Sequence, residues 1–147
     1  MTFIKHTRPE RAFTDKVRQG NVEPKERTQC DAIGEELHDK LLFEQIHRSI
    51  IKDKLYLDPA FSRKTYIKLC LMNKNRVAKL VQRYAGTNLN GYINGLRLEH
   101  AARLLREKPE LPIKAVAIDS GFRSRRTFYR LFAEKYGVTP TIYKERL

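Results

Sequence analysis

One pattern occurs twice in this sequence, and it constrains the fold more than any other feature. Residues 62–86 and 112–137 each contain a short helical segment, a tight turn and a longer helical segment with a basic outer face, ended by a glycine. Residues 88–107, between them, have one long helical pattern. No segment alternates apolar and polar residues with the period of a strand. The sequence therefore predicts an all-α fold of about seven helices, in which two helix-turn-helix subdomains are joined by a long linker helix.

Local signals mark where the helices start and stop. Two Asn-Gly dipeptides, at 90–91 and 94–95, are typical of hairpin turns. They lie four residues apart and leave almost no room for a strand, so we expect a helix there. Each glycine should lower the stability of that helix by about 1 kcal/mol relative to alanine. The other signals are N-caps and glycine C-caps. These caps are Ser62, Gly86, Ser124, Gly137 and the pair Thr139-Pro140.

Apolar residues at steps of three and four predict the buried face of each helix. In the first helix, expected to begin at about Asp39, they are Leu42, Phe43, Ile46, Ile50 and Ile51. In the linker they are Leu89, Tyr92, Ile93, Leu96, Leu104 and Leu105, with His100 or Ala101. In the short helix after Pro112 they are Ile113, Val116, Ala117 and Ile118.

The positive charge is concentrated in one part of the chain. The 30 Lys and Arg residues exceed the 17 Asp and Glu residues by 13. Residues 1–36 carry seven of each sign, so the whole excess belongs to residues 37–147. Such an excess predicts a polyanionic partner, most simply nucleic acid. We expect residues 1–38 to be a tail or linker, partly disordered, and residues 39–147 to be the working domain.

Other function classes leave no signature. Cys30 and Cys70 have no metal-ligand or disulfide spacing, which favours a reducing cytoplasm. No apolar run is long enough to cross a bilayer. We find no nucleophile–base pair, no phosphate-binding glycine loop and no metal-ligand cluster. We therefore expect neither an enzyme nor a bound cofactor. The histidines share no ligand spacing; they are His6, His38, His47 and His100.

The length of the linker helix suggests how the two units are used. Twenty residues at a rise of about 1.5 Å span roughly 30 Å. One turn of DNA is about 34–36 Å, and its major groove, about 12 Å wide, admits an α-helix. Two recognition helices held this far apart can enter successive major grooves, so that a monomer could bind both.

The residues in this arrangement resemble the DNA-binding domain of the AraC/XylS family of bacterial transcription regulators over about residues 40–146. The resemblance is most specific in the second half. It rests there on Ile113, Val116-Ala117, Gly121-Phe122, Phe128, Arg130, Phe132, Gly137, Thr139-Pro140 and Tyr143. It implies two helix-turn-helix units, sequence-specific binding to promoter DNA, and activation through contact with RNA polymerase. It also implies a cytoplasmic protein associated with the nucleoid.

Candidate DNA contacts follow from position and resemblance. Arg125 and Arg126 lie in the first turn of a helix, where the macrodipole disfavours cations, and this suggests a use beyond helix stability. Arginine can bind guanine through two hydrogen bonds, and asparagine can do the same with adenine. The predicted base contacts are Asn75, Lys79, Arg125, Arg126, Tyr129 and Arg130. The predicted backbone contacts are Arg76, Arg83, Arg123 and Lys114.

Each of these features has a simpler interpretation. The arginines can form a solvated basic face, and Tyr129 can pack against the linker. Arg97 and Arg103 of the linker are expected at the surface or in salt bridges. The first turn has Leu71 where the family commonly has glycine, so its backbone is expected to differ. The alternative function is a basic protein that binds nucleic acid or anionic membrane surfaces without specificity.

Overall fold

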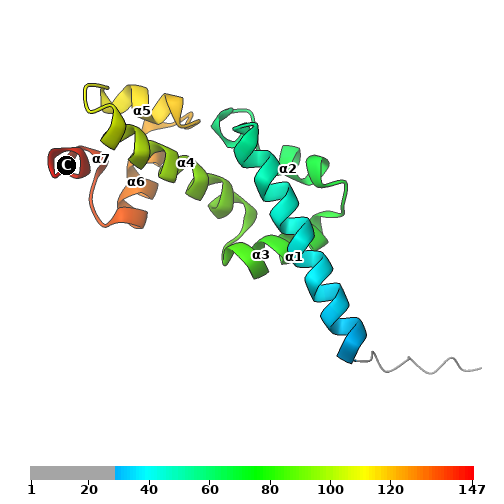
Figure 1. The fold of residues 1–147 in the computed structure, drawn as a ribbon. Coiled ribbons are helices and arrows are strands. Elements are labelled where there is room, and N and C mark those ends of the chain that lie inside the picture. The colour runs from blue at the N-terminus through cyan, green and yellow to red at the C-terminus, as the bar shows by residue number, and fades with distance from the viewer. Residues whose placement is uncertain (1–28) are drawn as a thin grey trace, which may run out of the picture.

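The structure, a computed structural model, describes residues 29–147, and helices are the only regular secondary structure in this part of the chain. Figure 1 shows two groups of helices at opposite ends of α4. This arrangement confirms the predicted all-α fold with two subdomains and a linker helix. The elements are α1 (Gln29–Lys52), the 3₁₀-helix η1 (Leu55–Leu57), α2 (Arg63–Cys70), α3 (Lys74–Ala85), α4 (Leu89–Glu107), α5 (Ile113–Asp119), α6 (Arg125–Tyr136) and α7 (Pro140–Glu145).

Side-chain caps and glycines end the helices where the sequence predicts. The Ser124 Oγ accepts the Thr127 N–H at 3.2 Å, and the Thr139 Oγ1 accepts the Ile142 N–H at 3.4 Å, as predicted. Asn88, which was not predicted as a cap, accepts the Gly91 N–H through its Oδ1 at 2.9 Å. Each bond satisfies one amide of a helix's first turn. Gly91 lies inside α4, where a Cβ would overlap the Thr87 Oγ1. A larger residue at position 91 would therefore require the Thr87 side chain to move.

Each subdomain has its own apolar core. In the first, Tyr66 of α2 lies at the centre, 1 % exposed, with its ring edge-on to that of Tyr92. The rest of this core is Ile50, Tyr56, Phe61, Cys70, Val77, Val81, Leu89 and Ile93. In the second, Phe128 and Phe132 of α6 are fully buried. They pack with Leu98, Ala101, Ala102, Leu104, Leu105, Val116, Ala117 and Phe122.

The linker α4 serves both cores by changing face halfway along its length. Its first half directs Leu89, Tyr92 and Ile93 into the first core. Its second half directs Leu98 and Leu105, with Ala101, Ala102 and Leu104, into the second core. The step from Leu96, which packs against the first core, to Leu98 is about 200° of helix rotation. The sequence did not predict burial of Leu98, because a single apolar stripe was assumed for the whole helix.

Two isoleucines that were expected in the core are not buried. Ile51 at the end of α1 is 40 % exposed, and Ile118 in α5 is 56 % exposed. Ile51 directly follows the buried Ile50, and Ile118 directly follows the buried Ala117. Consecutive residues on a helix point about 100° apart, so only one of each pair faces inward.

The first helix starts ten residues earlier than the sequence predicts. It begins at Gln29 rather than at about Asp39, so the part of the expected tail from 29 to 38 is helical. Residues 1–28 of that tail lie outside the described part of the chain. The additional turns were missed because polar contacts, not apolar ones, join them to the body. Ile33 and Leu37 in these turns are 60 % and 57 % exposed.

Arg97 of α4 joins the linker to the loop that follows α1. Its Nε donates to the Tyr56 carbonyl at 2.7 Å, and its Nη2 donates to the Asp58 and Phe61 carbonyls, each at 3.0 Å. Burial lowers the pKa of this guanidinium from its usual value. The expected surface or salt-bridging role is therefore wrong for Arg97, which satisfies three backbone acceptors between α1 and α2.

Candidate nucleic-acid interface

Helix α3 has an apolar inner face and a basic outer face. Val77, Leu80 and Val81 are buried in the first subdomain. The predicted base-contacting residues Asn75 and Lys79 are both exposed on the same helix. The N-cap Asn73 accepts the Arg76 N–H at 2.9 Å and so fixes where α3 begins. This end of α3 thus presents polar and cationic side chains to solvent.

The predicted backbone-contacting arginines of α3 are paired with carboxylates of α1. The Arg76 Nη2 lies 2.9 Å from the Asp39 Oδ1, and the Arg83 Nη2 lies 2.7 Å from the Glu36 Oε1. The Tyr84 hydroxyl donates to the Glu36 carbonyl at 3.0 Å. Both guanidinium groups are about half exposed, so they remain within reach of a phosphate.

A basic groove runs beside α3. It has a volume of about 650 Å³ and lies between α2, α3 and the start of α4. Its polar lining residues are Arg63, Lys74, Lys79, Gln82, Arg83, Asn88 and Asn90, with no carboxylate among them. Sequence reasoning missed Arg63, although the signal was present. Like Arg125, Arg63 is a cation in the first turn of a helix, where the macrodipole disfavours it.

In the second subdomain, three of the predicted base-contacting residues lie together at the start of α6. Arg125, Arg126 and Tyr129 line one shallow hollow of about 380 Å³. The Arg125 guanidinium carbon stacks over the Tyr129 ring, 5.3 Å from its centroid. The Tyr129 hydroxyl and the Thr141 Oγ1 of α7 lie 3.3 Å apart, and this hydrogen bond lowers the pKa of Tyr129. Tyr129 therefore supports Arg125 on one side and is held by α7 on the other.

The remaining predicted contacts of this subdomain are also exposed. The Arg130 Nη1 pairs with the Glu134 Oε1 at 2.8 Å within α6, and both side chains are more than half exposed. Such pairs contribute little stability in water, so a phosphate or a base can replace the carboxylate. Arg123 lies in the turn before α6, and Lys114 in the first turn of α5. The positive charge of Arg123 acts on Arg97 and is one of the causes that lower the Arg97 pKa.

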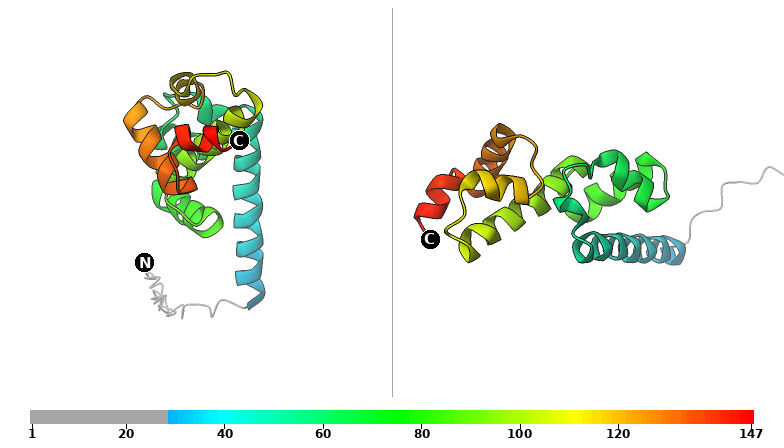
Figure 2. Two further views of the ribbon diagram at one scale, coloured as in Figure 1. Left: turned by 90° about the vertical axis from the view of Figure 1, so that its left-hand side faces the viewer. Right: turned by 90° about the horizontal axis from the view of Figure 1, so that it is seen from above.

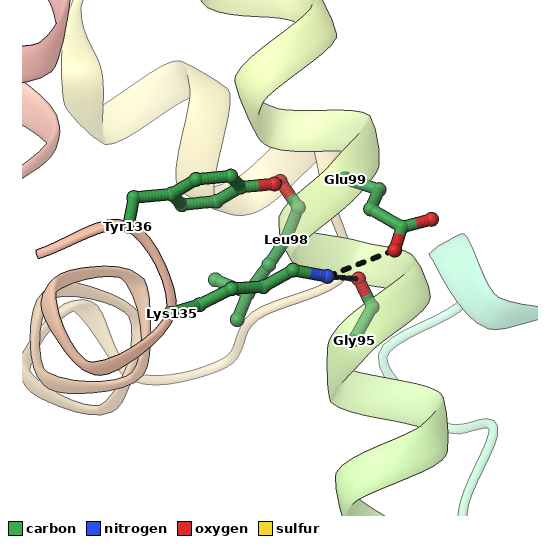
Figure 3. Close-up of polar contacts among 5 residues, drawn as sticks. All are labelled: Gly95, Leu98, Glu99, Lys135 and Tyr136. Carbon is green, nitrogen blue, oxygen red and sulfur yellow. Dashed lines mark hydrogen bonds and ion pairs between the residues drawn. The ribbon is translucent and has the colours of Figure 1, made fainter. Parts of the chain in front are cut away.

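Two residues of α6, Lys135 and Tyr136, fix its orientation through contacts with α4. The Lys135 Nζ lies 2.8 Å from the Glu99 Oε1 and donates to the Gly95 carbonyl at 3.4 Å (Figure 3). The Tyr136 hydroxyl donates to the Leu98 carbonyl at 3.4 Å. In Figure 1, α3 and α6 both lie below α4, whereas α5 lies above it. The two basic helices are thus attached to opposite ends of the same linker and lie on one side of it.

The two turns share one unusual backbone conformation. Leu71 has a φ of 52° and Gly121 a φ of 84°, both in the left-handed region. The two turns still differ in length, because one residue separates Leu71 from the N-cap Asn73 and two separate Gly121 from the N-cap Ser124. Leu71 thus has a positive φ although it is not a glycine, and its side chain is 93 % exposed.

Two histidines of residues 29–147, His47 and His100, make side-chain contacts within the fold, whereas His38 is exposed on α1. The His47 Nδ1 lies 2.7 Å from the Tyr92 hydroxyl at the edge of the first core. The His100 Nδ1 lies 2.8 Å from the Arg103 Nη2, and its ring is edge-on to Tyr56. In this part of the chain, no three His, Cys, Asp or Glu side chains are grouped so that they could hold a metal ion. Nor does any of its helices have the length and apolar character needed to span a membrane.

Comparison with known proteins relates this arrangement to characterised folds. Residues 68–146 match a helix-turn-helix domain family. The transcriptional regulatory protein YesN of Bacillus subtilis (strain 168) is 27 % identical over 122 residues, covering 82 % of this chain and 32 % of YesN. The regulatory protein SoxS of Escherichia coli (strain K12) is 30 % identical over 106 residues, covering 69 % of this chain and 98 % of SoxS.

Solved structures show the same helical architecture. The C-terminal domain of AraT, a response regulator from Geobacillus stearothermophilus, has a TM-score of 0.64 and 20 % identity, over 72 % of this chain and 85 % of that one. Among the sequence relatives, the matched region covers about a third of the length of YesN but almost the whole length of SoxS.

Proposed function

The chain belongs to the AraC/XylS family of helix-turn-helix, DNA-binding transcription regulators, and from this premise we propose that it binds a specific duplex sequence with two recognition helices. In this proposal, the exposed faces of α3 and α6 enter successive major grooves on one side of promoter DNA. A monomer then contacts two half-sites. The observation that carries the proposal is the placement of two exposed basic helices at opposite ends of α4, which is long enough to span roughly 28 Å.

The residues of α6 are suited to reading guanine. Arg125, Arg126 and Arg130 can each donate two hydrogen bonds to its O6 and N7 atoms. Tyr129 holds Arg125 by stacking, which reduces the entropy that the arginine loses on binding. In α3, Asn75 can read adenine and Lys79 can donate to an acceptor on a base edge.

Other cations would position the protein on the phosphate backbone. Arg76, Arg83, Arg123 and Lys114 carry no base-specific geometry in this proposal. The basic groove beside α3 supports the same role for Arg63. Binding through several such contacts releases counterions, so the affinity should fall steeply with salt, at a log–log slope near −0.9 for each phosphate neutralised.

Base-by-base affinity profiles test the two-groove arrangement. The site is first selected from random duplex DNA, and each base pair is then varied in turn. Arg126→Ala should relax preference in one half-site only, by about 1–3 kcal/mol, and Asn75→Ala should do so in the other. Arg83→Ala should weaken all sequences evenly and reduce the salt slope by about one. Arg48→Ala is the matched control, because it removes the same charge from an exposed residue of α1 whose guanidinium bonds to the Glu44 carbonyl of its own helix.

Two outcomes would overturn the proposal. If the Arg126 and Asn75 variants altered preference at the same base pairs, two separate grooves would be excluded. If the wild-type chain bound all duplexes and single-stranded RNA equally well, the alternative of nonspecific binding to nucleic acid would replace it.

We further propose that the bound chain activates transcription through RNA polymerase in the bacterial cytoplasm, at the nucleoid. The resemblance to AraC/XylS regulators supports this role. Transcription by purified polymerase from a promoter that carries the selected site should increase when the chain is added, and a decrease would identify a repressor instead.

A further inference from the structure

Helices α1 and α3 carry opposite charges where they meet. Residues 29–39 of α1 contain four Asp or Glu residues and no Lys or Arg. Helix α3 contains four Lys or Arg residues and no Asp or Glu. The two helices pack against each other, and the amino-terminal end of α1 extends past the rest of the first subdomain (Figure 2). The acidic turns of α1 therefore lie beside a helix that we expect to contact a polyanion.

Two ion pairs join α1 to the two arginines of α3 that we expect to contact the DNA backbone. Glu36 pairs with Arg83 at 2.7 Å, and Asp39 pairs with Arg76 at 2.9 Å. The Tyr84 hydroxyl also donates to the Glu36 carbonyl, which fixes this turn of α1 against α3. Each carboxylate thus occupies an arginine that would otherwise be available to a phosphate.

We infer that Glu36 and Asp39 lower the affinity of the first recognition helix for DNA by competing with backbone phosphates for Arg83 and Arg76. This inference rests on the proposed function and adds which residues set its strength. When either arginine binds a phosphate, its carboxylate competes with that phosphate for the guanidinium and remains next to the negatively charged DNA backbone. Both effects oppose binding in the first half-site.

The second subdomain is arranged differently. The carboxylate that pairs with Arg130 there is Glu134, which belongs to α6 itself and lies one turn further on. Helix α6 packs against α4, α5 and α7. The carboxylates that compete for the arginines of α3 therefore come from α1, whereas the one that competes for Arg130 lies on α6 itself.

The size of the effect follows from the exposure of the pairs. The side chain of Arg83 is 52 % exposed and that of Glu36 is 59 % exposed. Exposed pairs of this kind are weak, so removal of one should tighten DNA binding by about two- to fivefold. Because salt screens exposed charges, the gain should shrink as ionic strength rises.

Neutral isosteres test the competition. Glu36→Gln and Asp39→Asn should each tighten binding to the selected duplex by about two- to fivefold, and the double variant by more than either one. Glu44→Gln is the matched control, because Glu44 lies on α1 and pairs with neither arginine. Its effect should stay below about 1.5-fold at physiological salt, where long-range charge is screened. Circular dichroism should show the same helix content in all variants.

A double-mutant cycle distinguishes local pairing from general charge. In an Arg83→Ala background, Glu36→Gln should give no more gain than Glu44→Gln. Equal gains for Glu36→Gln and Glu44→Gln in the wild-type background would reduce the effect to net charge and overturn the inference. Weaker binding by Glu36→Gln would also overturn it, since the carboxylate would then position Arg83 for DNA. In either case specific binding by the wild-type chain would still stand, whereas no specific binding at all would refute the proposed function itself.

Discussion

Arg97 of α4 and Gly121 of the second turn meet at the junction of the two subdomains. A Cβ atom on Gly121 would lie 2.9 Å from the Arg97 Nε and 2.8 Å from the Leu57 carbonyl oxygen. Arg97 is held in place by three carbonyls of the segment from Tyr56 to Phe61. The backbone of the second helix-turn-helix unit therefore rests directly on the first subdomain, and Arg97 fills the space between them.

Gly121→Ala should destabilise the protein by about 2–3 kcal/mol, because the added methyl group meets backbone atoms that cannot move aside and the φ of 84° disfavours alanine. Urea denaturation measures the loss. Gly137→Ala is the control: Gly137 has a φ of 75°, but a Cβ there meets no atom within 4 Å, so only about 1 kcal/mol should be lost. Equal losses for the two variants would mean that the contact at Gly121 is unimportant.

Arg97→Lys should cost about 1–2 kcal/mol of unfolding free energy, although it keeps the charge. One ammonium group cannot reproduce the fork of donors that reaches three carbonyls, and the carbonyls left unpaired are partly buried. Arg103→Lys serves as the comparison, because Arg103 is exposed and should change stability by less than about 0.5 kcal/mol. A lysine that matched arginine at position 97 would contradict the structural role.

Leu71→Gly should stabilise the protein by about 0.5–1 kcal/mol. Leucine is strained at a φ of 52°, and its side chain is 93 % exposed, so little packing is lost with it. Leu69→Gly removes another exposed leucine, but from inside α2, and should cost about 1 kcal/mol. Thermal or urea unfolding measures the change in unfolding free energy for both variants. Destabilisation by Leu71→Gly would show that the strain is absent.

His100 should make the folded state less stable in mild acid. Burial, followed by the positive charges of Arg103 and Lys54, lowers the pKa of His100, while Asp119 and Glu107 oppose that change. Because the folded pKa lies below the unfolded value near 6.5, the unfolded state binds more protons between the two. Stability should therefore fall as pH drops from about 7 through the folded pKa. His100→Gln should flatten this dependence in urea titrations across the same range, and an unchanged slope would assign it to other groups.

Tyr129 should act through its ring rather than through its hydroxyl. The hydroxyl is hydrogen-bonded to Thr141, and the Arg125 guanidinium stacks over the ring. Tyr129→Phe should keep DNA affinity within about twofold, whereas Tyr129→Ala should lose roughly two- to fivefold and relax base preference at the pair that Arg125 reads. Fluorescence anisotropy with single-base variants of the site measures both. A large loss for Tyr129→Phe would indicate a direct contact between the hydroxyl and DNA.

Most helix ends from residue 62 onward, and much of each core, could be predicted from the sequence because their causes are local. An N-cap such as Ser124 bonds to an amide three residues away, and a C-cap glycine such as Gly86 acts at its own φ. Phe128 and Phe132 lie four residues apart, and this spacing places both on the same face of one helix. The predicted contact residues Asn75, Lys79, Arg125 and Arg126 all proved to be exposed, although their contacts with DNA stay predictions.

What the tertiary structure alone decided involves residues far apart in the chain. Glu36 meets Arg83, and Arg97 meets Tyr56, through contacts that leave no periodic trace in the sequence. The change of face between Leu96 and Leu98 has a similar origin, because apolar periodicity predicts burial against one core and α4 packs against two. The physical reason is that caps and turn conformations depend on a few neighbouring residues, whereas polar contacts between helices depend on where the packed cores place each backbone.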